Sequence, residues 1–75
     1  MIIIKNIDKN LREKGEHLYR LRINNQVICE FKHNREDSLS QCLMKAVAAA
    51  NAASGHFPEV PESFRFIGRS GQMVL

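Results

Sequence analysis

The sequence LYRLRINNQVICEFK, residues 18–32, decides the fold. In its first half Tyr19, Leu21 and Ile23 alternate with two arginines, and in its second half apolar and charged side chains alternate again. A period of two is typical of a β-strand with one buried face. The two asparagines between the halves tolerate a left-handed backbone, which favours a turn. The stretch therefore predicts a β-hairpin with one apolar and one charged face.

The register of this hairpin follows from its side chains. A two-residue loop would place Tyr19 opposite Glu30 and would mix the two faces, whereas a three-residue loop keeps apolar opposite apolar and places Arg20 opposite Glu30. A slip of one residue exposes the whole apolar row, so we expect the three-residue loop. That register pairs Ile23 with Val27, Leu21 with Cys29, Tyr19 with Phe31 and His17 with His33.

A helix follows the hairpin. Ser38 and Gln41 match a capping box, and Gly55 is a typical stop, so the helix is expected from about Leu39 to Ala53. Its second half is almost entirely alanine, and such small side chains permit a close approach to a sheet. The stripe at helical spacing consists of Leu39, Cys42, Leu43, Ala46, Val47, Ala50 and Ala53.

Shorter strands are expected at both ends. The β-branched run from Ile2 to Ile4 favours a strand, residues 6–16 are polar and look like a loop, and Pro58 and Pro61 favour an extended segment. Residues 64–67 and 72–75 then predict a final hairpin. The expected fold is α+β in one domain, residues 1–75: an antiparallel sheet with a single Ala-rich helix on one face, in the order β-β-β-α-β-β.

Length, charge and cysteine content limit the function. A chain of 75 residues has a small core and no room for a cofactor-binding fold plus a substrate pocket. The net charge of +3 is only mildly basic. Two cysteines without metal or redox spacing favour a reducing compartment, and no apolar run suits a signal peptide or a membrane span. We therefore expect a cytoplasmic protein that contacts no membrane.

The charged face of the central hairpin is the most suggestive site. Its members, extended by the last hairpin if that joins the same sheet, are Arg20, Arg22, Lys32, Arg65 and Arg69. Such a face is consistent with a plain solvent-exposed surface, with phosphate binding or with an acidic protein partner. Phe64 and Phe66 beside Arg65 are expected in the core, with base stacking as the alternative.

The other groups of polar and reactive residues give weaker evidence of a functional site. The loop from Lys5 to Glu16 carries mixed charges, which suits a solvated loop or, alternatively, a mobile partner-binding loop. Cys29 and Cys42 are expected to behave as small apolar side chains. There is no set of nucleophile, base and orienting group, so no catalytic residues, no metal, no cofactor and no enzymatic activity are expected.

The segment from Leu18 to Ala50, with its "Y-x-L-x-I-N" hairpin leading into an alanine-rich helix, resembles small open reading frames of bacteriophages and prophages. The complete layout is similar to that of some anti-CRISPR proteins against type I systems. The resemblance implies a non-enzymatic inhibitor that binds a host nucleic-acid-handling complex, acting in the cytoplasm of a bacterial host. It assigns a role to no individual residue. A small DNA- or RNA-binding module is the alternative, and exposed edge strands leave a homodimer open.

Overall fold

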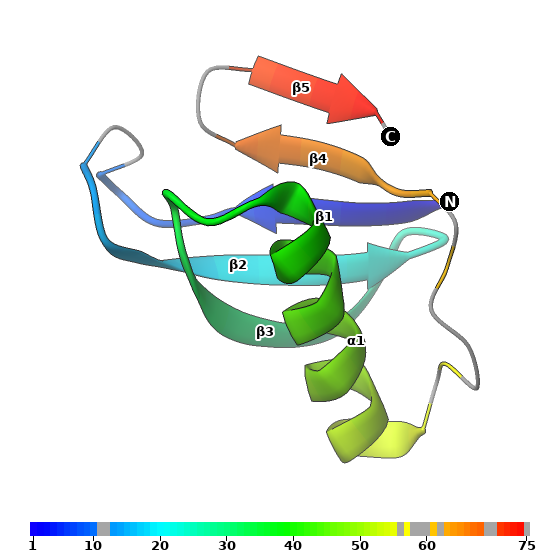
Figure 1. The fold of residues 1–75 in the computed structure, drawn as a ribbon. Coiled ribbons are helices and arrows are strands. Elements are labelled where there is room, and N and C mark those ends of the chain that lie inside the picture. Colours follow the sequence, from blue (N-terminus) through cyan, green and yellow to red (C-terminus); the bar gives the residue numbers. More distant parts are fainter. Residues whose placement is uncertain (11–12, 56, 58–60, 62, 69–70, 75) are drawn as a thin grey trace.

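The computed structural model describes residues 1–10, 13–55, 57, 61, 63–68 and 71–74. Five strands and one helix follow one another as β1 (Ile2–Asn6), β2 (Glu16–Ile23), β3 (Gln26–Asn34), α1 (Leu39–Ser54), β4 (Arg65–Gly68) and β5 (Gly71–Val74). The helix lies on one face of the sheet (Figure 1). The expected α+β class and the order β-β-β-α-β-β are confirmed.

The sheet is mixed, so the expectation of a fully antiparallel sheet is wrong. The strand order is β3-β2-β1-β4-β5, and β1 and β4 are parallel, with Ile4 beside Phe66, whereas the other neighbours are antiparallel. The reason is the helix. It carries the chain from the end of β3 back across the sheet, so that β4 must run in the direction of β3 and therefore of β1.

The turn of the central hairpin has two residues, not three. Asn24 and Asn25 have φ angles of 49° and 69°, and positive φ at both central residues is what a type I′ turn requires. The expected pairing of Ile23 with Val27 is therefore wrong, because Ile23 pairs with Gln26. A β-bulge between Leu21 and Arg22 then restores the expected register for the rest of the hairpin, from Leu21 with Cys29 to His17 with His33.

The bulge also changes which side chains of β3 face the core. Val27 lies opposite Arg22 and is 49% exposed, although the alternation placed it on the apolar face. Ile28 and Cys29 instead both pack against the core. One extra residue thus moves the pattern of β3 by one position at its turn end.

Both ends of α1 have the expected caps. The Ser38 hydroxyl accepts the Gln41 N–H at 3.2 Å, the Gln41 side chain accepts the Ser38 N–H, and Gly55 adopts a left-handed φ of 62°. The stripe expected to face the sheet is buried from Cys42 to Ala50, but Ala53 is exposed. The expectation that Ala53 faces the sheet is wrong, because the last turn of the helix extends beyond the packed core.

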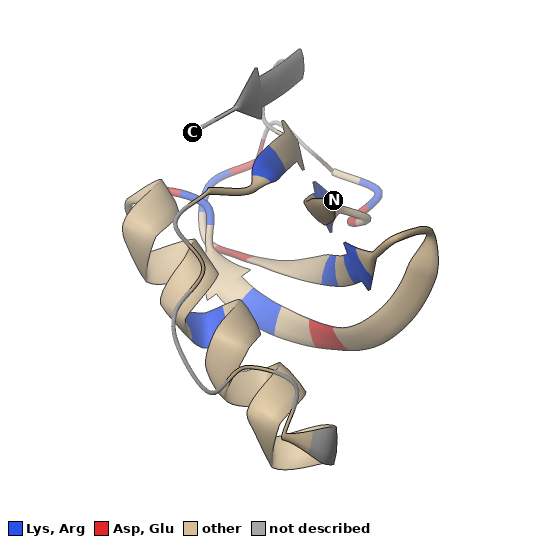
Figure 2. Cartoon of the chain, turned by 90° about the vertical axis from the view of Figure 1, so that its right-hand side faces the viewer, with Lys and Arg blue, Asp and Glu red and all other residues tan. Residues whose placement is uncertain are grey.

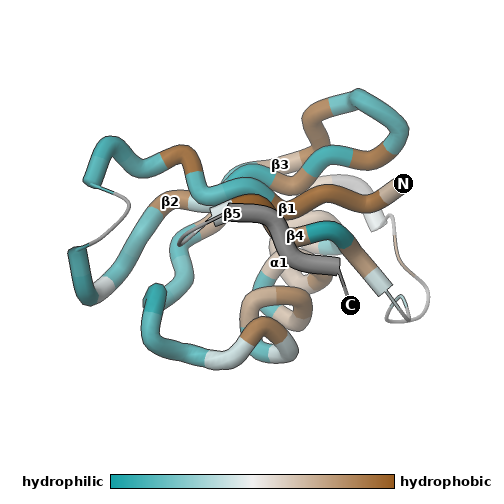
Figure 3. Tube along the Cα trace, turned by 90° about the horizontal axis from the view of Figure 1, so that it is seen from above, coloured by the Kyte–Doolittle hydropathy of each residue, from teal (hydrophilic) through white to brown (hydrophobic). Residues whose placement is uncertain are grey.

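The core lies between α1 and the sheet. Its buried members are Ile4, Tyr19, Leu21, Phe31, Cys42, Leu43, Ala46, Val47, Ala50, Phe64 and Phe66. Seen from above, the helix lies on one side of the sheet while the turn of the β2–β3 hairpin bends to the other (Figure 3). The core reading of Phe64 and Phe66 is confirmed, since they are 3% and 1% exposed. The stacking reading is thereby ruled out.

Candidate functional site on the open face of the sheet

The side of the sheet that faces away from α1 is called here the open face. Strand alternation and the cross-strand register determine which side chains of β1, β2, β3 and β4 lie on this face. Its members are Ile3, Lys5, Leu18, Arg20, Arg22, Glu30, Lys32, Arg65 and Ile67. Basic residues recur on adjacent strands, as Figure 2 shows.

Four of the five basic residues expected from the sequence come together on this face. Arg22 and Arg65 lie on either side of Ile3 in one cross-strand row, because each is a direct register partner of Ile3. Arg20 occupies the next row, opposite Glu30, and Lys32 lies opposite Leu18. Arg69 lies outside the described residues.

Sequence reasoning missed Lys5 as a member of the open face. Lys5 is the direct partner of Arg20 on one side and of Ile67 on the other, and it is exposed. The sequence places Lys5 at the start of the loop that is expected after the first strand. The three consecutive isoleucines show no alternation in the sequence, and only the burial of Ile4 and Asn6 on either side of the exposed Lys5 shows that the strand continues.

Arg20 and Lys32 have acidic partners among the described residues. The Arg20 Nε and Nη2 both donate to Glu30 Oε2, at 2.9 and 2.8 Å, and Lys32 lies 4.0 Å from Glu16. The side chains of Arg20 and Glu30 are 37% and 40% exposed, and an ion pair in such a position contributes only about 0.2–1 kcal/mol. The pair therefore lowers the charge of the face without holding it rigidly.

Lys5 makes no ion pair with any residue that the structure describes. Arg22 is only weakly held: its Nη2 donates to the Asn25 carbonyl at 3.4 Å, while its shielded Nε finds no acceptor in the described chain. Lys5 and Arg22 therefore keep the centre of the face cationic.

The surface between these cations is aliphatic. Ile3, Leu18 and Ile67 are half-buried there, and every aromatic residue of the chain is elsewhere. Tyr19, Phe31, Phe64 and Phe66 are in the core, and Phe57 packs against it. The open face thus combines arginine, lysine and branched aliphatic side chains but offers no ring for base stacking.

The N-terminal loop is fixed to the sheet by a buried polar network. His17, 3% exposed, donates from Nε2 to the Glu13 carbonyl at 2.7 Å and accepts at Nδ1 from Asn6 Nδ2 at 2.9 Å. Asn6 Oδ1 accepts the Asp8 N–H at 2.9 Å. The hydrogen bond from the Asn10 N–H lowers the pKa of the Asp8 carboxyl. These contacts favour a structural role for this end of the loop.

The thiols and histidines that the structure describes form no centre of their own. Cys42 is buried, Cys29 is half-buried, and burial raises the pKa of the Cys29 thiol, so it stays protonated at neutral pH. His17 and His33 are cross-strand partners, as expected. Among the described residues, no three His, Cys, Asp or Glu side chains are close enough together to hold a metal ion.

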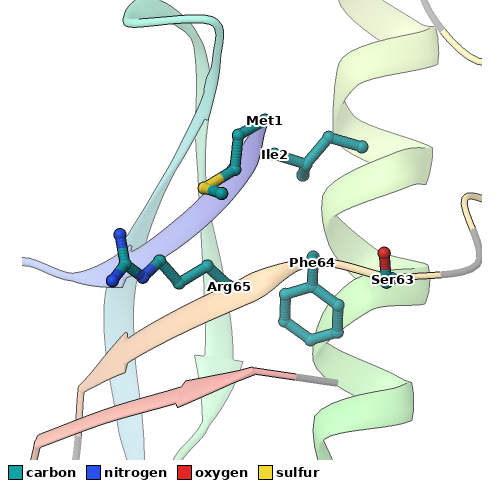
Figure 4. A pocket seen from close by; sticks show the side chains of 5 residues that line it. All are labelled: Met1, Ile2, Ser63, Phe64 and Arg65. Carbon is teal, nitrogen blue, oxygen red and sulfur yellow. The ribbon is translucent and has the colours of Figure 1, made fainter.

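A pocket opens at the start of the parallel pair β1 and β4. It has a volume of about 370 Å³ and is lined by Met1, Ile2, Ser63, Phe64 and Arg65 (Figure 4). Ser63 contributes a hydroxyl and Arg65 a guanidinium to a lining whose other side chains are apolar. The pocket adds an apolar recess beside Arg65 at the edge of the open face.

Comparisons with known proteins give no relative. No family model, curated protein or solved structure matches the chain. Within the part of the chain that the structure covers, no helix has the length and apolar character needed to cross a membrane.

Proposed function

We propose that the protein is a non-enzymatic binding protein whose open face docks onto an acidic surface of a protein partner. The observation that carries the proposal is the composition of that face. Arg22 and Arg65 flank Ile3, Lys5 adjoins Ile67, and α1, the helix of the described chain, packs on the opposite face of the sheet (Figures 1 and 2). Arginine combined with apolar contact area is typical of protein–protein interfaces.

The resemblance to phage inhibitors suggests the partner. We propose that it belongs to a host nucleic-acid-handling complex, in the manner of the anti-CRISPR proteins against type I systems. A net charge of +3 does not suit mimicry of DNA, so inhibition would come from steric blocking on an acidic part of such a complex. The cytoplasm of a bacterial host is the compartment that this proposal requires.

Direct binding of DNA or RNA is the second candidate, favoured by the clustering of basic residues on the open face. Such binding would rest on phosphate contacts and would weaken steeply with salt. Two observations favour the protein partner instead. The face lacks the aromatic platforms on which unpaired bases stack, and Glu30 and Glu16 already compensate two of its cations.

We expect the double variant Arg22→Glu with Arg65→Glu to lose inhibition. The change places two carboxylates on either side of Ile3, and repulsion from an acidic partner should weaken binding at least tenfold. The assay is interference by a type I CRISPR complex in a bacterial host that expresses the protein, together with co-purification of the complex. Thermal unfolding shows whether the variant is folded.

The matched control is Lys9→Glu with Lys14→Glu, which changes the net charge by the same amount in the exposed N-terminal loop. It should keep full inhibition. Wild-type protein that leaves interference intact and captures no component of the complex would contradict the proposal. Saturable binding of labelled DNA or RNA at low salt, lost in the open-face variant alone, would favour the second candidate.

A further inference from the structure

At the centre of the open face two cations lie on neighbouring strands, and among the described residues Arg20 has a carboxylate partner while Lys5 has none. Lys5 and Arg20 are direct partners across the antiparallel pair β1–β2, with their side chains on the same face. Like charges in this position destabilise a sheet, since directly opposed Cβ atoms lie only about 5 Å apart. Departures from a local rule of this kind are expected where a ligand supplies the compensation.

The neighbours of this pair define what it can bind. Ile67 borders Lys5 across β4, Ile3 precedes it by two residues on β1, and Leu18 lies two residues from Arg20 on β2. Half-buried aliphatic side chains therefore border two adjacent cations. The complementary group is a carboxylate that projects from an apolar surface.

Glu30 shows how a carboxylate binds to Arg20 on the open face. Glu30 approaches Arg20 from the β3 side and accepts two of its N–H groups at one oxygen, Oε2. Lys5 is the register partner of Arg20 on the β1 side, and no ion pair joins it to an acid among the described residues. Glu30 thus pairs with Arg20, one of the two neighbouring cations, and leaves the other, Lys5, without a carboxylate among the described residues.

We propose that Lys5 and Arg20 together form the seat for a carboxylate of an acidic, leucine-bearing segment of the protein partner, and that Glu30 competes with that carboxylate for Arg20. The inference rests on the proposed function and names the contact at its centre. In this arrangement Lys5 has the main role in affinity, ahead of Arg22 and Arg65. Glu30 limits which carboxylates bind, because only a carboxylate that also contacts Lys5 displaces Glu30 from Arg20.

Two substitutions with opposite effects test the seat. The probe is a fluorescein-labelled peptide of Glu-Glu-Leu repeats, titrated against the whole protein at low salt by fluorescence anisotropy. We expect Lys5→Gln to weaken binding about fivefold and Glu30→Gln to strengthen it about threefold, in keeping with the modest strength of exposed charge pairs. Lys9→Gln, an equal charge change in the exposed loop, should leave the affinity within error.

Thermal unfolding separates a binding role from a structural one. Lys5→Gln removes a like-charge contact, so its melting temperature should be equal to or above that of the wild type while its affinity falls. A Lys5→Gln variant that binds like Lys9→Gln, or a Glu30→Gln variant that binds no tighter than the wild type, would overturn the seat and leave the proposed function standing. A wild-type protein that does not bind the peptide overturns both.

The nucleic-acid alternative has its own outcome in the same experiment. A labelled single-stranded oligothymidylate replaces the peptide, at the same salt concentration. If the oligonucleotide binds more tightly than the peptide, and Lys5→Gln and Lys9→Gln weaken it equally, the face acts as a diffuse phosphate surface and the seat is refuted.

Discussion

Tyr19→Ala is expected to remove most of the protein's free energy of unfolding. Tyr19 is fully buried at the centre of the core, where its ring lies 5.8 Å from Phe31, 5.9 Å from Phe66 and 5.4 Å from His33. Removing a buried aromatic ring costs about 3–5 kcal/mol, and small domains have a free energy of unfolding of only about 5–15 kcal/mol. With 75 residues, this domain belongs at the low end of that range.

Urea denaturation followed by circular dichroism measures the loss. Tyr19→Phe keeps the ring and its packing, so it should lose much less stability than the alanine variant. Val27→Ala, on the same hairpin but 49% exposed, should change the free energy of unfolding by about 0.5 kcal/mol or less. A Tyr19→Ala midpoint close to that of the wild type would mean that the ring is not the centre of the core.

His17→Ala is expected to have the next largest effect on stability, about 3 kcal/mol. The buried ring makes one hydrogen bond to Asn6 and one to the Glu13 carbonyl, and its removal leaves the buried Asn6 amide and the part-buried Glu13 carbonyl without their partner. An unsatisfied buried polar group costs about 1–3 kcal/mol in addition to the lost packing. The Asp8 amide, held through Asn6, should exchange its hydrogen faster.

Glu13→Ala is the matched control for this prediction. The oxygen that accepts from His17 belongs to the main chain, so loss of the exposed Glu13 side chain should have little effect. Hydrogen exchange and chemical denaturation measure both variants. Equal losses in His17→Ala and Glu13→Ala would show that the loop depends on side-chain charge and not on the buried network.

Most local structure could be predicted from the sequence because it depends on short-range rules. Alternation located β2 and β3, and the Ser38–Gln41 capping box and Gly55 located both ends of α1. The bulge was missed because a two-residue turn with one extra residue in β3 gives the same pairing beyond Leu21 as a three-residue loop. Periodicity alone does not separate these two solutions.

The parts that sequence reasoning missed depend on contacts between distant segments. The parallel pairing of β1 with β4 follows from the crossover through α1, which no local pattern records. Four of the five expected cations gather on the open face because alternation fixes which side of a strand each residue takes. Lys5 was missed because the first strand was expected to end before it, and its partner Arg20 could not be assigned without the β1–β2 register.

The parallel contact between β1 and β4 also has a consequence for how fast the chain folds. It joins Ile3 with Arg65 and Ile4 with Phe66, and each of these pairs is separated by 62 positions in the sequence. Loop closure over such a distance slows folding, whereas the β2–β3 hairpin and α1 form from neighbouring residues. We expect truncation of Phe66 to speed unfolding and to leave the refolding rate nearly unchanged, and truncation of Leu21 to slow refolding. Stopped-flow measurement of both limbs tests this order, in which the last contact to form is the one that fixes Arg65 beside Ile3.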